Sequence, residues 1–105
     1  MPIKIYLKSK SNTYYAEGTY SDGMVTVMKG AKIQLDFAIH IRGGTKAKNL
    51  RSDKTIVDET GTVIKDCIFS SPSTAAQFIT GRSTNGYVAW HIDKKTTLGK
   101  YLGRE

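Results

Sequence analysis

The chain has 105 residues, and its 16 lysines and arginines outnumber its nine acidic residues, which gives a net charge of +7. This length fits one domain over residues 1–105, because two domains would each be too short to bury a stable core. The 39% apolar share is ordinary for a folded domain and excludes wholesale disorder. No apolar run approaches the roughly 18 residues of a membrane span, and the first residues do not begin a secretory signal. We therefore expect a cytoplasmic domain with no membrane partner.

The first part of the chain has the patterns of β-strands. Apolar and polar residues alternate over residues 3–8, Thr and Tyr dominate residues 14–20, and a third apolar run covers residues 24–28. Asp22-Gly23 separates the second and third runs and predicts a hairpin turn, because both residues tolerate positive φ. The strongest alternation follows over residues 33–41, and it should bend or end before the next glycine pair, since nine residues exceed the length of a usual strand.

The middle of the chain predicts short elements. Residues 45–52 are compatible with one or two helical turns. Two apolar pairs, at residues 56–57 and 63–64, are separated by a turn sequence and predict a second hairpin. Ser71-Pro72 then predicts the start of a helix, with Ser as the N-cap and Pro at the first helical position, and Gly81 predicts its end.

The end of the chain predicts one strand and one helix. Asn85-Gly86 reads as a turn into an alternating strand with Val88, Trp90 and Ile92 on one face. Leucines and a tyrosine at i, i+3, i+4 spacing predict a closing helix around residues 98–102. The whole pattern predicts an α+β fold: a small single domain with a mostly antiparallel sheet and two or three short helices.

Catalytic constellations are not visible in the sequence. His40 and His91 lack the short spacing of a metal pair, and Cys67 has no partner cysteine, so we predict no metal site and no cofactor. Cys67 is expected to pack as a small apolar residue. Asp58, Glu59 and Asp66 flank a predicted turn and are expected to be loop residues, not a general acid–base pair. We therefore expect the protein not to be an enzyme.

The positive charge is concentrated between residues 42 and 54. Five basic residues stand there against Asp53, among Gly, Thr and Asn, and such a segment suits contact with phosphate oxygens. The alternative is a solvated face that only keeps the protein soluble. The candidate phosphate contacts within the segment are Arg42, Lys46, Lys48 and Arg51.

A second candidate site is the polar loop between the predicted helix and the last strand. Arg82 and Asn85 can bind guanine or adenine edges with two hydrogen bonds, and Ser83 lies between them, so we expect base readout here. Alternatively, Asn85-Gly86 is simply a turn and Arg82 a cation at a helix C-terminus. Trp90 is expected in the core in preference to base stacking.

One segment resembles a known family. Its motif combines Phe69-Ser-Ser-Pro-Ser-Thr-Ala-Ala76, then Gly81-Arg-Ser83, then Asn85-Gly-Tyr87 and Trp90. This pattern resembles the domain of unknown function DUF4357 and, more distantly, the RAMA domain (restriction enzyme and adenine methylase associated). The match is dense over residues 69–90 and weaker over residues 20–37. Tyr87 stands where the family more often has tryptophan.

The resemblance implies an association with DNA processing, because these domains accompany GIY-YIG nuclease modules or restriction and methylation enzymes. Together with the charge, it leads us to expect a non-catalytic nucleic-acid-binding accessory domain, with DNA favoured over RNA. A nuclease or DNA methyltransferase is the expected protein partner. The alternative is a protein-interaction module that docks on such an enzyme.

Overall fold

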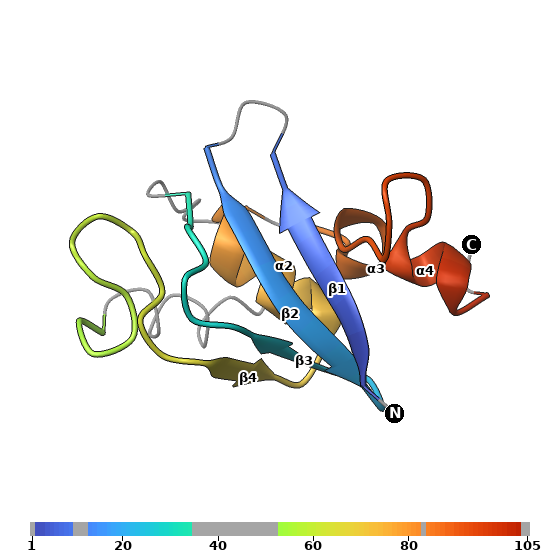
Figure 1. Ribbon diagram of the computed structural model, residues 1–105, viewed down its shortest axis with the longest axis horizontal. Helices are drawn as coiled ribbons and strands as arrows, with labels where there is room; N and C mark the ends of the chain where they lie inside the picture. The colour runs from blue at the N-terminus through green and yellow to red at the C-terminus, as the bar shows by residue number, and fades with distance from the viewer. Residues whose placement is uncertain (1, 10–12, 35–52, 83, 104–105) are drawn as a thin grey trace.

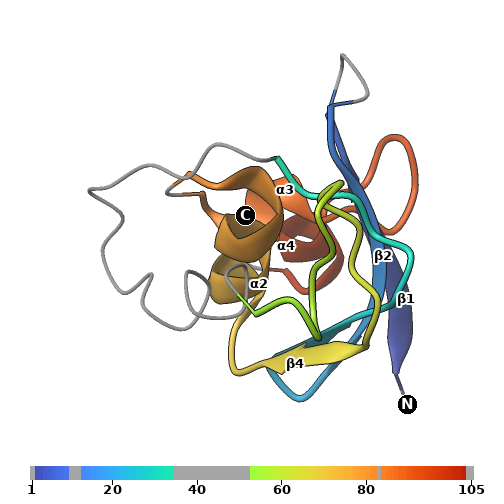
Figure 2. The ribbon, with the colours of Figure 1, turned by 90° about the vertical axis from the view of Figure 1, so that its left-hand side faces the viewer.

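The computed structural model describes residues 2–9, 13–34, 53–82 and 84–103. Within these ranges, an antiparallel sheet has three short helices packed on one of its faces (Figure 1, Figure 2). The sheet has four strands in the order β1-β2-β3-β4. The predicted α+β class is therefore confirmed.

The strands follow the alternation in the sequence. They are β1 (Ile3–Lys8), β2 (Tyr15–Ser21), β3 (Met24–Val27) and β4 (Cys67–Phe69). The first two pair from Ile3 with Tyr20 to Lys8 with Tyr15. The β2–β3 turn holds Asp22 at φ 50° and Gly23 at φ 84°, as predicted. The sequence analysis did not predict β4, which pairs with β3 across a long connection.

The sheet is extended beyond β3 by isolated pairings. Lys32 pairs with Tyr15 on one side and with Thr62 on the other, and Val57 pairs with Val63. The last of these pairings confirms the hairpin that was predicted over residues 56–64. Of the predicted strand 33–41, residues 35 onward lie outside the described residues, and so do the helical turns predicted over residues 45–52.

The helix α2 (Pro72–Thr80) begins and ends as predicted. The Ser71 hydroxyl accepts a hydrogen bond from the Thr74 amide at 3.1 Å, and Pro72 occupies the first helical turn. Gly81 ends the helix with φ 72°, a left-handed conformation that costs glycine little. Seven of the nine residues of α2 are buried against the rest of the fold.

The strand predicted over Val88, Trp90 and Ile92 is wrong. Asn85 caps a short helix, α3 (Gly86–Ala89), and the chain becomes extended only from Trp90 onward. Val88 is therefore exposed, whereas Trp90 is fully buried, as expected from its predicted core role. The predicted closing helix is confirmed as α4 (Leu98–Tyr101), which Thr97 caps.

The hydrophobic core lies between the sheet and α2. Its largest fully buried side chains are Trp90, Phe69 and Phe78, and the two phenylalanine rings are 5.2 Å apart between centroids. The Trp90 indole donates a hydrogen bond to the Pro72 carbonyl at 3.1 Å, which ties α3 to the start of α2. Cys67 is buried in this core, as predicted. None of the helices in the described ranges is long and apolar enough to cross a membrane.

Candidate nucleic-acid interface

The structure describes only part of the predicted interface. The four predicted phosphate contacts, Arg42, Lys46, Lys48 and Arg51, all lie outside the described residues, and so does Ser83 of the predicted readout loop. The role of the 42–54 segment therefore remains a prediction. Arg82 and Asn85 lie within the described ranges, where both are exposed.

Two threonines hold the backbone of Arg82 in place. The buried Thr80 hydroxyl accepts a hydrogen bond from the Arg82 amide at 3.2 Å, and the Thr84 hydroxyl donates to the Arg82 carbonyl at 2.9 Å. The two hydroxyls also lie 2.9 Å apart and hydrogen-bond each other. The backbone of Arg82 is therefore fixed beside the end of α2, while its guanidinium group remains exposed to solvent.

Asn85 has a structural role in the same loop. Its Oδ1 accepts a hydrogen bond from the Tyr87 amide at 3.0 Å, so it caps α3. The next residue, Gly86, donates its amide hydrogen to the Ser73 hydroxyl at 3.0 Å. A Cβ atom at Gly86 would overlap the Pro72 carbonyl group, so the loop must have glycine here. Capping accounts for the Asn85 side-chain oxygen, and base readout by Asn85 remains a prediction.

A cleft of about 460 Å³ separates the end of the β1–β2 pair from the loop between α2 and α3. We call it the Arg82 cleft. The end of β1 and the residues just before β2 supply one wall of the cleft. The end of α2 and the region around α3 supply the other wall. It is lined by Leu7, Lys8, Thr13, Tyr14, Gln34, Thr80, Arg82, Thr84, Ala89 and His91.

The lining of the Arg82 cleft suits an anion. Lys8 and Arg82 reach it from different elements, and the described residues that line it include no carboxylate.

An exposed turn that carries Lys94 and Lys95 lies beside the end of β1 (Figure 1). The Asp93 carboxylate in that turn accepts the Lys95 amide hydrogen at 2.9 Å. This backbone bond is the main reason why the pKa of Asp93 is lowered from its ordinary value.

His91 connects the Arg82 cleft to the edge of the sheet. Its backbone exchanges two hydrogen bonds with Tyr6 of β1, at 2.8 and 2.9 Å. Its ring Nδ1 lies 3.0 Å from the Ala89 carbonyl, and because a carbonyl only accepts, Nδ1 carries the hydrogen. In the neutral ring, Nε2 is then left as a hydrogen-bond acceptor.

Sequence reasoning missed most of this cleft. The lining residues come from segments far apart in the chain, and no local pattern links Lys8, Tyr14, Gln34 and His91 to Arg82.

Tyr14 is half-buried and packs against the core, and Tyr20 does the same. Tyr15 is 39% exposed, and its hydroxyl donates to Glu17 at 2.6 Å, a bond that raises the pKa of the phenol.

Asp58 and Asp66, which lie near the second hairpin, stabilise turns by accepting hydrogen bonds at their carboxylates. The Asp58 Oδ1 accepts hydrogen bonds from the amides of Thr60 and Thr62, and the hydrogen bond from the Thr60 hydroxyl is the largest cause of its lowered pKa. The Asp66 carboxylate accepts the Lys29 amide hydrogen at 2.8 Å. These contacts confirm both as loop residues. Among the described residues, no cluster of three or more His, Cys, Asp or Glu could hold a metal ion.

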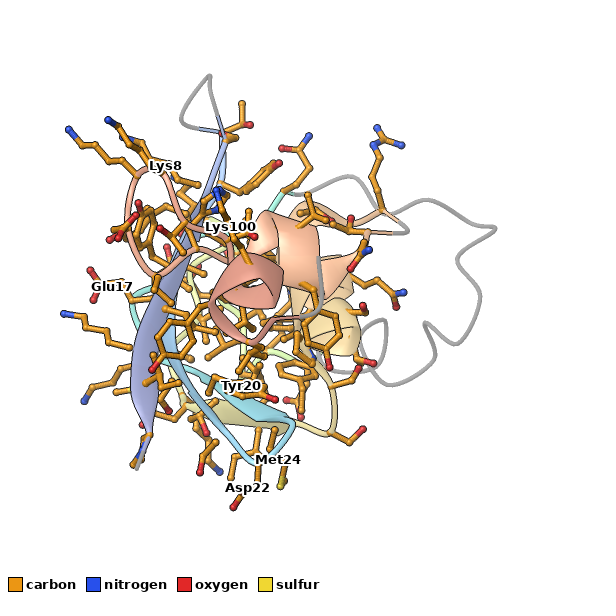
Figure 3. All side chains as sticks on the ribbon, turned by 90° about the vertical axis from the view of Figure 1, so that its right-hand side faces the viewer. Lys8, Glu17, Tyr20, Asp22, Met24 and Lys100 are labelled. Atoms are coloured by element: carbon orange, nitrogen blue, oxygen red, sulfur yellow. The ribbon has the colours of Figure 1, made fainter. Side chains whose placement is uncertain are left out.

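A second surface has the opposite character. The outer side of β3 and β4 carries Met24, Thr26 and Ile68, with Thr26 paired directly to Ile68, and we call this the β3–β4 face. Met24 is 48% exposed and Ile68 is 55% exposed. Figure 3 shows Met24 at the opposite end of the molecule from Lys8. The two surfaces are therefore well separated.

Comparison with known proteins identifies a family but no individual relative. No curated protein and no solved structure matches the chain significantly. The model of the family described as "Domain of unknown function (DUF4357)" matches residues 5–102, which include nearly all of the sheet and all three described helices. The chain therefore belongs to the DUF4357 family.

Proposed function

We propose that this protein is a non-catalytic nucleic-acid-binding domain that holds DNA phosphates at the Arg82 cleft. The observation that carries the proposal is the charge of the cleft: Lys8 and Arg82 line it, and no described lining residue is acidic. The chain as a whole has a net charge of +7, which favours association with a polyanion.

The local structure at Arg82 supports phosphate binding. A guanidinium group binds phosphate oxygens with two parallel hydrogen bonds, so the direction of its approach matters. Because Thr80 and Thr84 already fix the Arg82 backbone, only the side chain must be ordered when an anion binds. In this proposal, the 42–54 segment adds further phosphate contacts that raise affinity without reading sequence.

The cellular setting of the proposed function follows from the family resemblance. The resemblance to domains that accompany restriction, methylation and GIY-YIG nuclease enzymes favours an accessory role beside such an enzyme. In this role the partner enzyme carries out the chemistry and this domain supplies affinity for the DNA.

A salt-dependent binding assay tests the proposal. Fluorescence anisotropy with a labelled 16-base-pair duplex should show an affinity that falls steeply between about 50 and 200 mM NaCl. Arg82→Gln should weaken binding about threefold to tenfold and reduce the slope of the salt dependence by about one phosphate contact. Lys65→Gln is the matched control, because Lys65 is exposed and does not line the cleft. Equal effects of the two substitutions would remove the cleft from the interface.

The β3–β4 face favours one alternative, a module that docks on a nuclease or methyltransferase. Exposed Met24 and Ile68 side chains suit the apolar centre of a protein interface. Such docking would depend on apolar substitutions and change little with salt, so the same salt series distinguishes the two functions.

A further inference from the structure

The helices of the fold are poorly suited to reading a duplex groove. Helix-based readers insert an exposed helical face into the major groove. Here α2 has seven of its nine residues buried, and α3 and α4 have four residues each. Among the described residues, the candidate site is instead concave, and a concave site takes in a group that projects from the nucleic acid.

The Arg82 cleft has the size and the chemistry for one nucleotide. Its volume of about 460 Å³ falls in the range of small-ligand pockets. Tyr14 contributes an aromatic ring, and Ala89 contributes apolar surface, against which a flat base can pack. The Gln34 amide and the His91 ring add polar groups of the kind that hydrogen-bond a base edge.

Two cationic residues line the cleft, one on each wall, and they can hold the backbone on either side of such a nucleotide. Lys8 belongs to the wall formed by β1, and Arg82 belongs to the wall formed by the loop after α2. A strand that crosses the cleft passes both of them, so each can neutralise a phosphate that flanks the inserted base. The backbone N–H of Gln34 donates to the Ile79 carbonyl at 2.8 Å, which fixes the segment that carries Gln34 to α2.

We propose that the Arg82 cleft binds one unstacked nucleotide, and that the protein therefore prefers single-stranded nucleic acid to duplex. This inference rests on the proposed function and narrows it, because duplex DNA keeps its bases stacked and paired. An unpaired strand offers a base to the cleft without the cost of opening a duplex.

The test compares three labelled probes at the same low salt concentration: a 12-nucleotide DNA strand, its duplex, and a strand with abasic sites at every second position. We expect the intact strand to bind at least fivefold tighter than the duplex and at least fivefold tighter than the abasic strand, since one stacked base is worth about that factor or more. An RNA strand of the same sequence shows whether the sugar matters, and a preference for either single strand supports the inference.

Tyr14 variants identify the cleft as the place where the base binds. Tyr14→Phe keeps the ring and should bind the single strand nearly as wild type does, whereas Tyr14→Leu should bind it at least fivefold more weakly. Thermal unfolding of both variants shows whether they fold, and the abasic probe tests the inference without any substitution.

The possible failures are distinguishable. Equal or tighter binding of the duplex, with a loss caused by Arg82→Gln, would overturn the unstacked nucleotide and leave nucleic-acid binding in place. No binding of any probe at about 20 mM NaCl would overturn both proposals, since electrostatic attraction is strongest there.

Discussion

The Arg82 cleft and the β3–β4 face differ in how the chain builds them. The cleft is assembled from loop and strand ends, and the backbone of Arg82 is held by hydrogen bonds with the hydroxyls of Thr80 and Thr84. The β3–β4 face is the outer side of regular strands, where alternation alone places Met24 and Ile68 in solvent. The first surface is polar and cationic, and the second is apolar.

This difference bears on the partner that each surface can select. Fixed hydrogen-bonding groups around a concave site select a ligand by its charge and shape, and they lose affinity when one group moves. An exposed apolar strand surface selects less sharply and gains affinity mainly from buried area. The comparison therefore predicts that small changes near α2 and α3 affect nucleic-acid binding, while changes on the β3–β4 face do not.

The largest loss of stability is expected from Gly86→Ala. The added methyl group would overlap the backbone of Pro72 and Ser73, so α3 must shift away from α2 and the wall of the cleft must move. Overpacking of this kind should lower the free energy of unfolding by about 2–3 kcal/mol or more. Thermal unfolding measures the loss, and Val88→Ala on the exposed side of α3 is the control that should change stability little.

Smaller losses, in both stability and affinity for nucleic acid, are expected from Thr80→Val. The substitution keeps the shape of the buried side chain and removes the hydroxyl that accepts the Arg82 amide hydrogen. We expect a loss of about 1–2 kcal/mol in stability from the lost hydrogen bonds. Affinity for nucleic acid should fall roughly threefold because Arg82 is no longer held, as would be measured by anisotropy. Full affinity in this variant would show that the position of Arg82 does not matter.

Asp93→Asn should slightly raise the affinity for nucleic acid, whereas the two substitutions above weaken the protein. Asparagine can still accept the Lys95 amide hydrogen, but it removes the negative charge beside His91 and two lysines. Affinity for nucleic acid at low salt should therefore rise by about twofold or less.

The melting temperature of Asp93→Asn should also depend less on pH than that of the wild-type protein. The pKa of Asp93 is lowered in the folded protein, so its contribution to stability is present above the ordinary pKa of Asp and is lost as the pH falls through the folded-state pKa. Melting temperatures measured from about pH 6 down to about pH 2.5 should fall less steeply for Asp93→Asn than for wild type. Parallel curves would show that the charge of Asp93 does not contribute.

The smallest effect is expected from Ile68→Ser on the β3–β4 face. Ile68 is 55% exposed, so the free energy of unfolding should change by no more than about 0.5 kcal/mol. Affinity for single-stranded and duplex probes should stay within about twofold of wild type, since no phosphate contact is removed. A loss as large as that of Arg82→Gln would mean that the two surfaces do not act separately.

Much of the fold could be predicted because local signals determine it. The Thr- and Tyr-rich run over residues 14–20 and the apolar run over residues 24–28, with Asp22-Gly23 between them, were enough to place a hairpin. The cap residues Ser71 and Gly81 located both ends of α2. These elements depend on neighbours in the chain, which a sequence displays directly.

The errors came from elements whose form depends on distant contacts. Val88, Trp90 and Ile92 alternate like a strand, but Asn85 caps a helix, and the buried Trp90 is oriented by its bond to Pro72. β4 has three consecutive apolar residues and no turn beside it, so only its pairing with β3 defines it as a strand.

The candidate site was predictable only in part. Arg82 was identified because an arginine in a polar loop after a helix suits contact with a base edge. Lys8, Tyr14 and His91 join it only after the end of the β1–β2 pair packs beside the α2–α3 loop, and no spacing rule in the sequence expresses that packing.

The burial of Trp90 also determines what its fluorescence can report. It is the single tryptophan of the chain, it is fully shielded from solvent, and its indole hydrogen is bonded to the Pro72 carbonyl. Its emission should be blue-shifted and insensitive to iodide in the folded protein, and both properties should be lost on unfolding. Because Trp90 does not line the Arg82 cleft, a ligand that changes this emission must also have disturbed the contact between α2 and α3.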